Sequence, residues 1–282
     1  MTTNSRRARA RGLLFSLLPL LLPGAWPAPA WAAAPASVQL EDLTGPELRE
    51  RIAGGATTAL LPIGGTEQNG PHMALGKHNR RAQLLAVRIA QQLGDAIVAP
   101  VLAYVPEGSI SPPSQHMRFP GTISIPESAF ERLLADAARS LRATGFCHLV
   151  LLGEHGGYRA SLDRVAAQVN REWAPRSACR VHALPEYYRA AAGGYAQLLA
   201  SQGYSAAEIG THAGLADTAL TMALDPTLVR ADRLAQAAGA RHPGNGVAGD
   251  PAKATAELGR AGVELIVRAS VAAIRAATQP GQ

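Results

Sequence analysis

The chain has 282 residues, of which 47% are hydrophobic and 17% are charged, a composition typical of a globular protein rather than a disordered or fibrous one. Its 27 basic and 21 acidic residues give a net charge of +6, but four of the arginines lie within the first eleven residues, and without them 23 basic residues face 21 acidic ones, a net charge of +2. This balance, together with the lack of any basic stripe, argues against a nucleic-acid partner.

The N-terminal segment has the pattern of a secretory signal peptide. A basic stretch precedes the apolar run LLFSLLPLLLPGAW, and the small residues of APAWAAAPA follow. We therefore expect residues 1–32 to be cleaved near Ala32 and residues 33–282 to be exported, to the periplasm. The alternatives are an anchor that is never removed and a twin-arginine signal, which the residues after Arg6 and Arg7 fit poorly. Because the apolar run is short and contains prolines, we expect no stable membrane insertion after processing.

Along the mature chain, short apolar runs alternate with amphipathic stretches. Strands are predicted, in chain order, at residues 57–64, 95–104, 148–153 and 179–186, and helices between them at 80–94, 126–145 and 159–173. Residues 207–224 are predicted to begin as a loop and become helical near Asp217, and a long helix ends the chain. Apolar strands separated by helices predict an α/β fold, a single-domain layered sandwich whose mainly parallel sheet is covered by helices on both faces.

Metal-type side chains gather after the predicted strands. The loop after the first strand, in LPIGGTEQNGPHMALGKH, holds four of them within twelve residues: Glu67, Asn69, His72 and His78. His116 lies in the long loop after the second strand, and His155 follows the third in LLGEHGG. Parallel sheets bind ligands at the carboxyl ends of their strands, so we expect these loops to open at one edge of the sheet.

Three of these side chains suit a divalent metal: Glu67, His78 and His155. A catalytic zinc or manganese ion takes about three protein ligands and keeps a position for water, which it acidifies for attack on an amide carbonyl. The competing interpretations are that the loop histidines are solvated or hydrogen-bonded, or that GEHGGY is a phosphate-binding turn. That turn lacks a complete GxGxxG pattern and a lysine.

The loop LPIGGTEQNGPHMALG resembles the metal loop of the creatininase family, the creatinine amidohydrolases. FPGTISI (119–125), LLGEHGGY (151–158) and THAGLADTAL (211–220) are similar to three further segments of that family, in the family's order. The resemblance implies a single α/β domain that hydrolyses non-peptide C–N bonds, chiefly in cyclic amides. It also implies a divalent metal centre and a homo-oligomer, often a hexamer.

Carried over by position, the resemblance makes Glu67 and His155 metal ligands. It places His212 near the substrate, where it would polarise the carbonyl or move a proton. Asp217 stands where a family glutamate completes the metal site, one methylene shorter, and is expected to be a fourth ligand or the general base.

Two departures from the family pattern predict one ion per chain. Asn69 stands where a family histidine binds the second metal, and an amide oxygen is a poor zinc ligand. His78 stands where a carboxylate bridges two ions about 3.5–4 Å apart, which an imidazole cannot do. We therefore expect a single ion on Glu67, His78 and His155. Zn is expected first, with Mn or Fe as alternatives.

Other positions near these motifs are predicted to touch the substrate. His116 is expected to line the pocket. Tyr158 is expected either to contact the substrate or to serve as a structural hydroxyl at a helix start. Glu154 is expected either to orient the His155 ring or to form a surface ion pair.

The predicted function is an exported, metal-dependent amidohydrolase that opens a cyclic amide or a similar small molecule, with Asp217 or Glu154 moving the proton. Creatinine itself is not expected, because the loops that depart from the family pattern are those nearest the metal. The alternatives are a periplasmic small-molecule binding protein without turnover and a peptide-trimming relative.

Four remaining side chains are expected to be structural. Cys147 and Cys179 each flank a predicted strand, and two buried thiols are expected, with a disulfide as the alternative in an exported protein. His148 and His182 lie inside predicted strands and are expected in the core.

Overall fold

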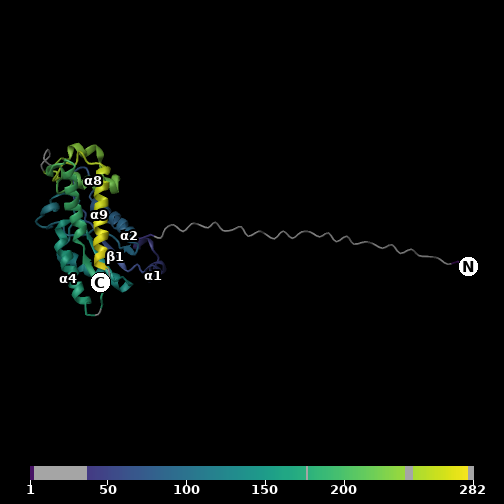
Figure 1. Ribbon diagram of the computed structural model, residues 1–282. Helices are drawn as coiled ribbons and strands as arrows, with labels where there is room; N and C mark the ends of the chain where they lie inside the picture. The colour runs from purple at the N-terminus through teal and green to yellow at the C-terminus, as the bar shows by residue number, and fades with distance from the viewer. Residues whose placement is uncertain (3–36, 176, 239–243, 279–282) are drawn as a thin grey trace. The chain divides into compact units, whose positions relative to one another are not determined.

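A parallel sheet with the strand order β2-β1-β3-β4 carries the fold in the computed structural model (Figure 1). The strands are β1 (Thr58–Ile63), β2 (Ala96–Val98), β3 (His148–Gly153) and β4 (Arg180–Ala183). β1 is buried along its whole length, as expected for a strand covered on both faces. The predicted parallel sheet is confirmed.

The helices and helical turns follow the strands along the chain. The α-helices are α1 (Gly45–Ala53), α2 (Lys77–Leu93), α3 (Glu127–Thr144), α4 (Arg159–Trp173), α5 (Pro185–Arg189), α6 (Tyr195–Ser201), α7 (Ala206–Ile209), α8 (Leu215–Leu224) and α9 (Ala256–Thr278). The short 3₁₀ turns are η1 (Leu40–Asp42), η2 (Gln115–Arg118), η3 (Gly156–Tyr158), η5 (Pro226–Leu228) and η6 (Ala231–Gln236), and η4 (Ala190–Gly194) is a π-helical turn.

Alternate residues of the central strands pack into two apolar layers. On one face, Leu60 and Val150 meet α2 and α9, and α9 also packs along α8 (Figure 1). On the other face, Leu61 and Leu151 meet α3 and α4. This two-residue alternation confirms the predicted sandwich with helices on both faces.

Two predicted boundaries differ from the structure for identifiable reasons. β2 is shorter than the predicted 95–104, because Pro100 lacks the N–H that a ladder needs. The chain still runs beside β1, and Leu102 N donates to Pro62 O at 2.9 Å. α2 begins at Lys77, three residues earlier than predicted, so His78 lies in the first turn of a helix and not in the loop.

Cys147 and Cys179 form a disulfide, so the prediction of two buried thiols was wrong. The register pairs His148 with Arg180, which puts the residues just before them side by side, with a Cα–Cα distance of 4.5 Å. The sequence placed each cysteine beside a strand but did not reveal that β3 and β4 are neighbours.

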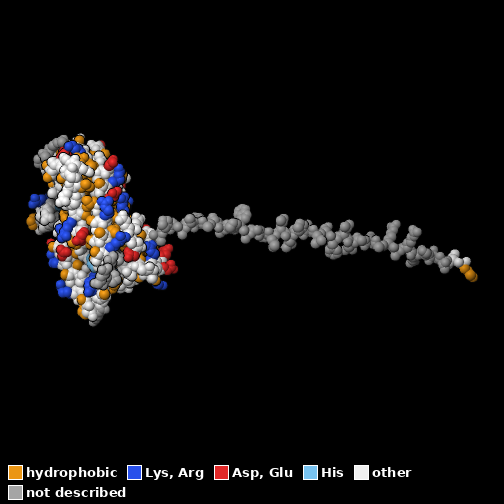
Figure 2. Space-filling view, in the orientation of Figure 1, with side chains coloured by type: hydrophobic (Ala, Val, Ile, Leu, Met, Phe, Trp, Pro, Cys, Tyr) orange, Lys and Arg blue, Asp and Glu red, His pale blue; other side chains and the backbone are white. Residues whose placement is uncertain are grey.

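The structure describes residues 1–2, 37–175, 177–238 and 244–278, and the described residues from 37 onward belong to one compact unit. The predicted leader therefore lies, except for its first two residues, outside the described part. Among the described residues, no helix combines the length and apolar character needed to span a membrane. Figure 2 shows acidic and basic side chains intermixed on the face in view.

Candidate metal centre

The loop after β1 buries Glu67 beneath the carboxyl edge of the sheet. The Glu67 side chain is fully buried, and its backbone N–H donates to Leu75 O at 3.2 Å. The Asn69 amide donates to Glu67 O at 2.9 Å and to Ala74 O at 3.1 Å. Asn69 therefore holds the loop in shape.

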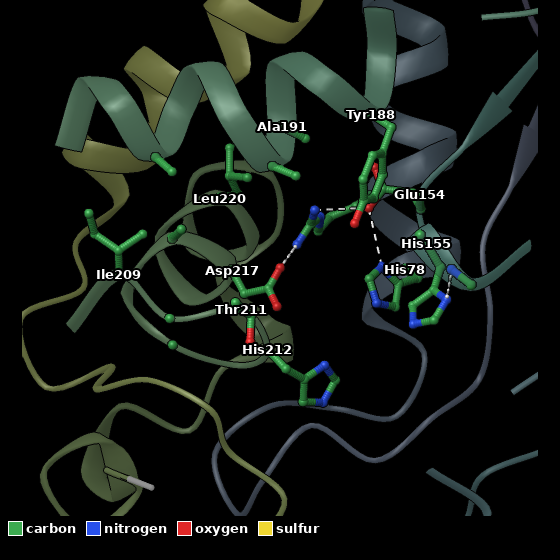
Figure 3. A pocket seen from close by; sticks show the side chains of 18 of the residues that line it. His78, Glu154, His155, Tyr188, Ala191, Ile209, Thr211, His212, Asp217 and Leu220 are labelled. Atoms are coloured by element: carbon green, nitrogen blue, oxygen red, sulfur yellow. Dashed lines mark hydrogen bonds and ion pairs between the residues drawn. The ribbon is translucent and has the colours of Figure 1, made fainter. Parts of the chain in front are cut away.

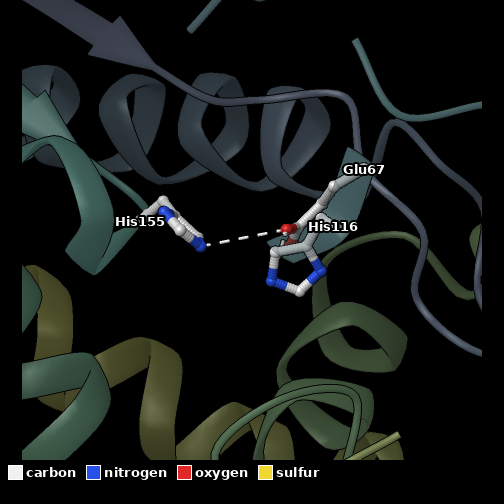
Figure 4. Close-up of side chains that lie close together, drawn as sticks. All are labelled: Glu67, His116 and His155. Carbon is white, nitrogen blue, oxygen red and sulfur yellow. Dashed lines mark ion pairs between the residues drawn. The ribbon is translucent and has the colours of Figure 1, made fainter. Parts of the chain in front are cut away.

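Glu67, His116 and His155 form a potential metal-binding cluster, with one ligand atom from each residue within 4.8 Å of the others (Figure 4). His116 Nε2 lies 3.3 Å and His155 Nε2 3.8 Å from Glu67 Oε2. These three residues come from the loop after β1, from η2 and from the end of β3. The expectation that separate loops open at one edge of the sheet is confirmed.

His155 caps η3, and the turn orients its ring. Gly157 N–H donates to His155 Nδ1 at 3.0 Å. Burial lowers the pKa of His155 to about 4, so the ring is neutral near pH 7, as a metal ligand must be. In a neutral ring that accepts at Nδ1, the proton is on Nε2. An ion at Nε2 therefore requires that proton to move to Nδ1 and the Gly157 contact to open.

His78, a predicted ligand, instead lies between two carboxylates. Its Nε2 is 2.7 Å from Glu67 Oε1, and its Nδ1 is 3.2 Å from Glu154 Oε2. With both nitrogens engaged, the ring has no free lone pair for an ion. We therefore replace His78 by His116 in the ligand set. Because α2 begins at Lys77, His78 lies in its first turn, where its ring contacts the Glu67 carboxylate instead of binding an ion.

Glu154 belongs to this buried network and is not a surface pair. It accepts from Arg81 Nη2 at 2.9 Å and from the Tyr187 hydroxyl. Burial alone would raise its pKa, but the Arg81 guanidinium and His78 lower it to about 2. Glu154 therefore orients His78, not His155, and is a poor proton acceptor.

Asp217 pairs with two buried cations, which contradicts its predicted role as ligand or base. Its oxygens lie 2.8 Å from Lys77 Nζ and 2.8 Å from Arg81 Nη1. Burial alone would raise its pKa, but these two charges hold the pKa well below its usual range. Asp217 thus ties α8 to α2 and positions the site.

His212 lies in the loop before α8 and lines the pocket. Its Nε2 lies 2.9 Å from the Gln68 carbonyl oxygen, which can only accept, so the ring proton is on Nε2. Its Nδ1 lies 3.6 Å from Glu67 Oε1 with its lone pair free. Burial lowers the pKa of His212 to about 4, which keeps the ring neutral near pH 7.

Tyr158 is structural, so its predicted contact with the substrate was wrong. The ring is almost fully buried, and its hydroxyl lies 2.8 Å from both Ile63 O and Gly64 O. The same hydroxyl accepts from His155 N at 3.0 Å. It thereby fastens the His155 turn to the end of β1.

The sequence reasoning missed Glu107, which lies in the loop between β2 and η2. Its side chain is 1% exposed, and its Oε2 is 3.8 Å from His155 Nε2. Burial and the nearby charge of Glu67 raise the pKa of Glu107 to about 9. The same strand-end rule that selected His116 applies to this glutamate, which stands in AYVPEG.

A pocket of about 400 Å³ opens beside these groups (Figure 3). One side is polar and includes His78, His116, His155 and His212. In Figure 3, the apolar side chains of Ile209 and Leu220 lie across the pocket from His78 and His155. The pocket can hold a small molecule with a polar group at the cluster and an apolar body beyond it.

Comparison with known proteins places this chain among hydrolases. Residues 41–274 match the family model Creatininase, described as creatinine amidohydrolase. The creatinine amidohydrolase of Pseudomonas putida is 30% identical over 203 residues, which cover 70% of this chain and 76% of that protein. The mycofactocin precursor peptide peptidase of Mycolicibacterium smegmatis is 36% identical over 128 residues, which span 42% of this chain and only 49% of that relative.

Solved structures agree with these matches. A structure described as "Creatininase Mn" is 28% identical with a TM-score of 0.72, and another creatininase structure, described as a Zn-Zn type, is 27% identical with a TM-score of 0.71. Each alignment covers 87% of this chain and 100% of the other chain.

Proposed function

The chain belongs to the creatininase family of amidohydrolases, and on that premise we propose that it is a metal-dependent hydrolase that opens the C–N bond of a small cyclic amide or a similar compound. The observation that carries the proposal is that Glu67, His116 and His155 each place a ligand atom within 4.8 Å of the others, and that both histidines line the pocket. Related structures described with Mn and Zn support a divalent ion, with Zn first and Mn or Fe as alternatives.

The donor atoms suit such an ion. Glu67 Oε2 is buried and accepts no hydrogen bond from any described residue, a costly arrangement for a carboxylate unless a cation lies beside it. Two imidazoles and one carboxylate form a common ligand set of catalytic zinc. The Asn69 amide nitrogen donates into the loop, and its amide oxygen is a poor zinc ligand, which supports one ion per chain and not two.

The protein's own groups perform the remaining steps. When bound, the ion would lower the pKa of a water molecule and polarise the amide carbonyl. His212 Nδ1, with its free lone pair, would take the proton from the attacking water and pass it to the departing nitrogen. His78 orients the Glu67 carboxylate through its contact with Oε1. Lys77 stabilises the ionised form of Asp217, and Arg81 stabilises that of Glu154.

Two other functions stay as alternatives. Trimming of a peptide terminus is favoured by the similarity to a mycofactocin precursor peptide peptidase. A binding protein without turnover is favoured by the departures at Asn69 and His78. The pocket of about 400 Å³ favours a small molecule over an extended peptide.

An activity assay that combines a range of substrates with removal of the metal tests the proposal. The purified full chain is assayed on lactams, hydantoins, formamides and short peptides, before and after metal removal. We expect turnover of a non-peptide amide that a chelator abolishes and Zn²⁺ or Mn²⁺ restores.

A matched pair of variants accompanies this assay. Glu67→Gln is expected to lower kcat/KM by at least about 100-fold, because it removes a ligand. Glu172→Gln, at an exposed glutamate paired with Arg139, is expected to change nothing. Ligand binding without turnover would favour the binding protein, cleavage of peptides alone would favour the peptidase, and two tightly held ions per chain would contradict a single-ion centre.

Export and oligomerisation are further parts of the proposal. The leader-like sequence of residues 1–32 and the Cys147–Cys179 disulfide support export, because disulfides persist in oxidising compartments such as the periplasm. N-terminal sequencing of the protein from the periplasmic fraction should begin near residue 33. Family membership supports a homo-oligomer, and light scattering would distinguish a hexamer from a monomer.

A further inference from the structure

We propose that Glu107 is a fourth protein ligand of the metal centre, so that the centre consists of two glutamates and two histidines. The inference rests on the proposed function, because it completes the cluster of Glu67, His116 and His155. Glu107 reaches the cluster from the loop after β2, an element that supplied none of the metal ligands predicted from the sequence.

The backbone around Glu107 is fixed by hydrogen bonds, while its carboxyl group lies beside that of Glu67 and accepts no hydrogen bond from a described residue. Glu107 N–H donates to Ser124 Oγ at 3.0 Å, and that hydroxyl donates to Gly108 O at 2.7 Å. Ile125 N–H donates to Val105 O at 3.2 Å. Both carboxylate oxygens are buried, yet neither accepts a hydrogen bond from any described residue. The loop thus holds a buried carboxylate against the cluster with its oxygens free.

Gly65 makes room for this carboxylate. A Cβ at position 65 would lie 2.5 Å from Glu107 Oε1, and the backbone there has a φ of +152°, which disfavours other residues. Gly65, the second of the two glycines that follow β1, therefore forms one wall of the space occupied by Glu107.

The spacing of the ligand atoms fits a shared ion better than direct contacts. His155 Nε2 lies 3.8 Å from Glu67 Oε2 and 3.8 Å from Glu107 Oε2, too far for hydrogen bonds. Two atoms that each lie about 2.0–2.1 Å from one ion can be at most about 4.2 Å apart. The two 3.8 Å distances from His155 Nε2 are within this limit, so the spacing allows Glu67, Glu107 and His155 to share an ion.

The charges near the cluster also match a divalent ion. The two buried cations are already engaged, Lys77 by Asp217 and Arg81 by Glu154 and Asp217. With the histidines left out of the count and every carboxylate counted as ionised, four acids and two bases leave a charge of −2. The acids are Glu67, Glu107, Glu154 and Asp217, and the bases are Lys77 and Arg81. One divalent ion neutralises this charge, and two carboxylates with two imidazoles suit Zn and Mn alike.

The rival explanation is that Glu107 stays protonated beside Glu67 and never touches a metal. The variant Glu107→Gln distinguishes these two explanations. Its amide has the same shape as the protonated acid but is a weak metal ligand. The full chain is freed of metal, Zn²⁺ affinity is measured by competition with a chromophoric chelator, and Co²⁺ is titrated as a probe whose visible spectrum reports the coordination.

If Glu107 is a ligand, Glu107→Gln should weaken Zn²⁺ binding by about 100-fold or more and change the Co²⁺ spectrum. The unfolding of the metal-free variant should match that of the metal-free wild type or occur at a higher temperature. Glu172→Gln, the same change at an exposed site, should leave both metal readouts unaltered. Gly65→Ala keeps every ligand but pushes on Glu107, and it should also weaken binding.

The outcomes keep this inference apart from the proposed function. A wild type that binds neither Zn²⁺ nor Co²⁺ would overturn the metal centre itself. A wild type that binds both ions while Glu107→Gln keeps its affinity and spectrum would overturn only the role of Glu107. If Glu107→Gln does not fold, Gly65→Ala decides, and unchanged affinity and spectrum in that variant would overturn the assignment.

Discussion

At the scale of single residues, the role of each histidine follows from what faces its two nitrogens. His78 has a carboxylate at each nitrogen and so braces Glu67. His212 gives one nitrogen to a carbonyl and keeps the other free towards the site. His116 directs Nε2 at Glu67, and Gln68 Nε2 lies 3.2 Å from its Nδ1. The same side chain is thus a brace, a proton acceptor or a ligand, depending on its neighbours.

Replacing His116 or His78 by alanine, one at a time, tests the revised set of metal ligands. His116→Ala should weaken Zn²⁺ binding by more than about 100-fold, because it removes a ligand. His78→Ala should weaken it by about 10–100-fold, because it only loosens the ligand Glu67. Competition titration of both variants measures the difference. Nearly intact binding in His116→Ala with complete loss in His78→Ala would restore the original prediction of His78 as ligand.

At the scale of elements, β3 and β4 carry a histidine pair away from the pocket. His148 Nδ1 lies 3.2 Å from His182 Nε2, and the two rings are 5.4 Å apart. Burial lowers the pKa of both rings, and burial together with the nearby His148 and Arg180 lowers that of His182 to about 4. The sequence predicted both histidines to be in the core or structural. They are only partly buried, so they are not core residues, and their position within the strands and outside the metal-ligand cluster and its pocket agrees with a structural role.

This pair should make stability depend on pH. The unfolded chain takes up protons near pH 6.5, whereas folded His182 resists protonation until about pH 4. Between these values protons bind preferentially to the unfolded state, so the free energy of unfolding should fall as the pH drops from about 6.5 to about 4. His182→Gln should reduce this slope in urea unfolding measured at pH 7, 5.5 and 4.5. An unchanged slope would show that the pair does not contribute, and measurements between pH 7 and 8 serve as the control.

At the scale of the whole molecule, buried ion pairs and a disulfide join elements that the sequence keeps far apart. Lys77 and Arg81 of α2 form ion pairs with Asp217 of α8, and Arg81 also forms an ion pair with Glu154 at the end of β3. The Cys147–Cys179 disulfide joins residues 32 positions apart, and the closed segment contains β3 and α4. The metal-binding edge therefore rests on a scaffold that is tied at both ends of the sheet.

Removing the disulfide should lower the free energy of unfolding. For a loop of this length, the chain-entropy estimate is about 3–4 kcal/mol, because the reduced unfolded chain regains conformational freedom. Urea unfolding of the wild type with and without reductant, and of the double variant Cys147→Ala with Cys179→Ala, measures the loss. The double variant should be insensitive to reductant. A loss below about 1 kcal/mol would mean that the disulfide adds little to the scaffold.

Local sequence patterns were sufficient to predict much of the fold of this protein. The alternation of apolar strands and amphipathic helices predicted the parallel sheet and its helical covering, and α4 spans the residues predicted for it. The strand-end rule placed Glu67, His116 and His155 at one edge of the sheet, and the family resemblance added His212. These features depend on periodicity and on short motifs, which are properties of neighbouring residues.

Tertiary packing decided the rest. The choice of His116 over His78, the isolation of Glu107 and the pairing of Cys147 with Cys179 all depend on where segments distant in the sequence meet. A residue's type tells which atoms it offers, but only the packed structure decides which of those atoms are already satisfied by a neighbour and which are left free for a metal ion. No local pattern carries that information, because the partners come from other strands and loops.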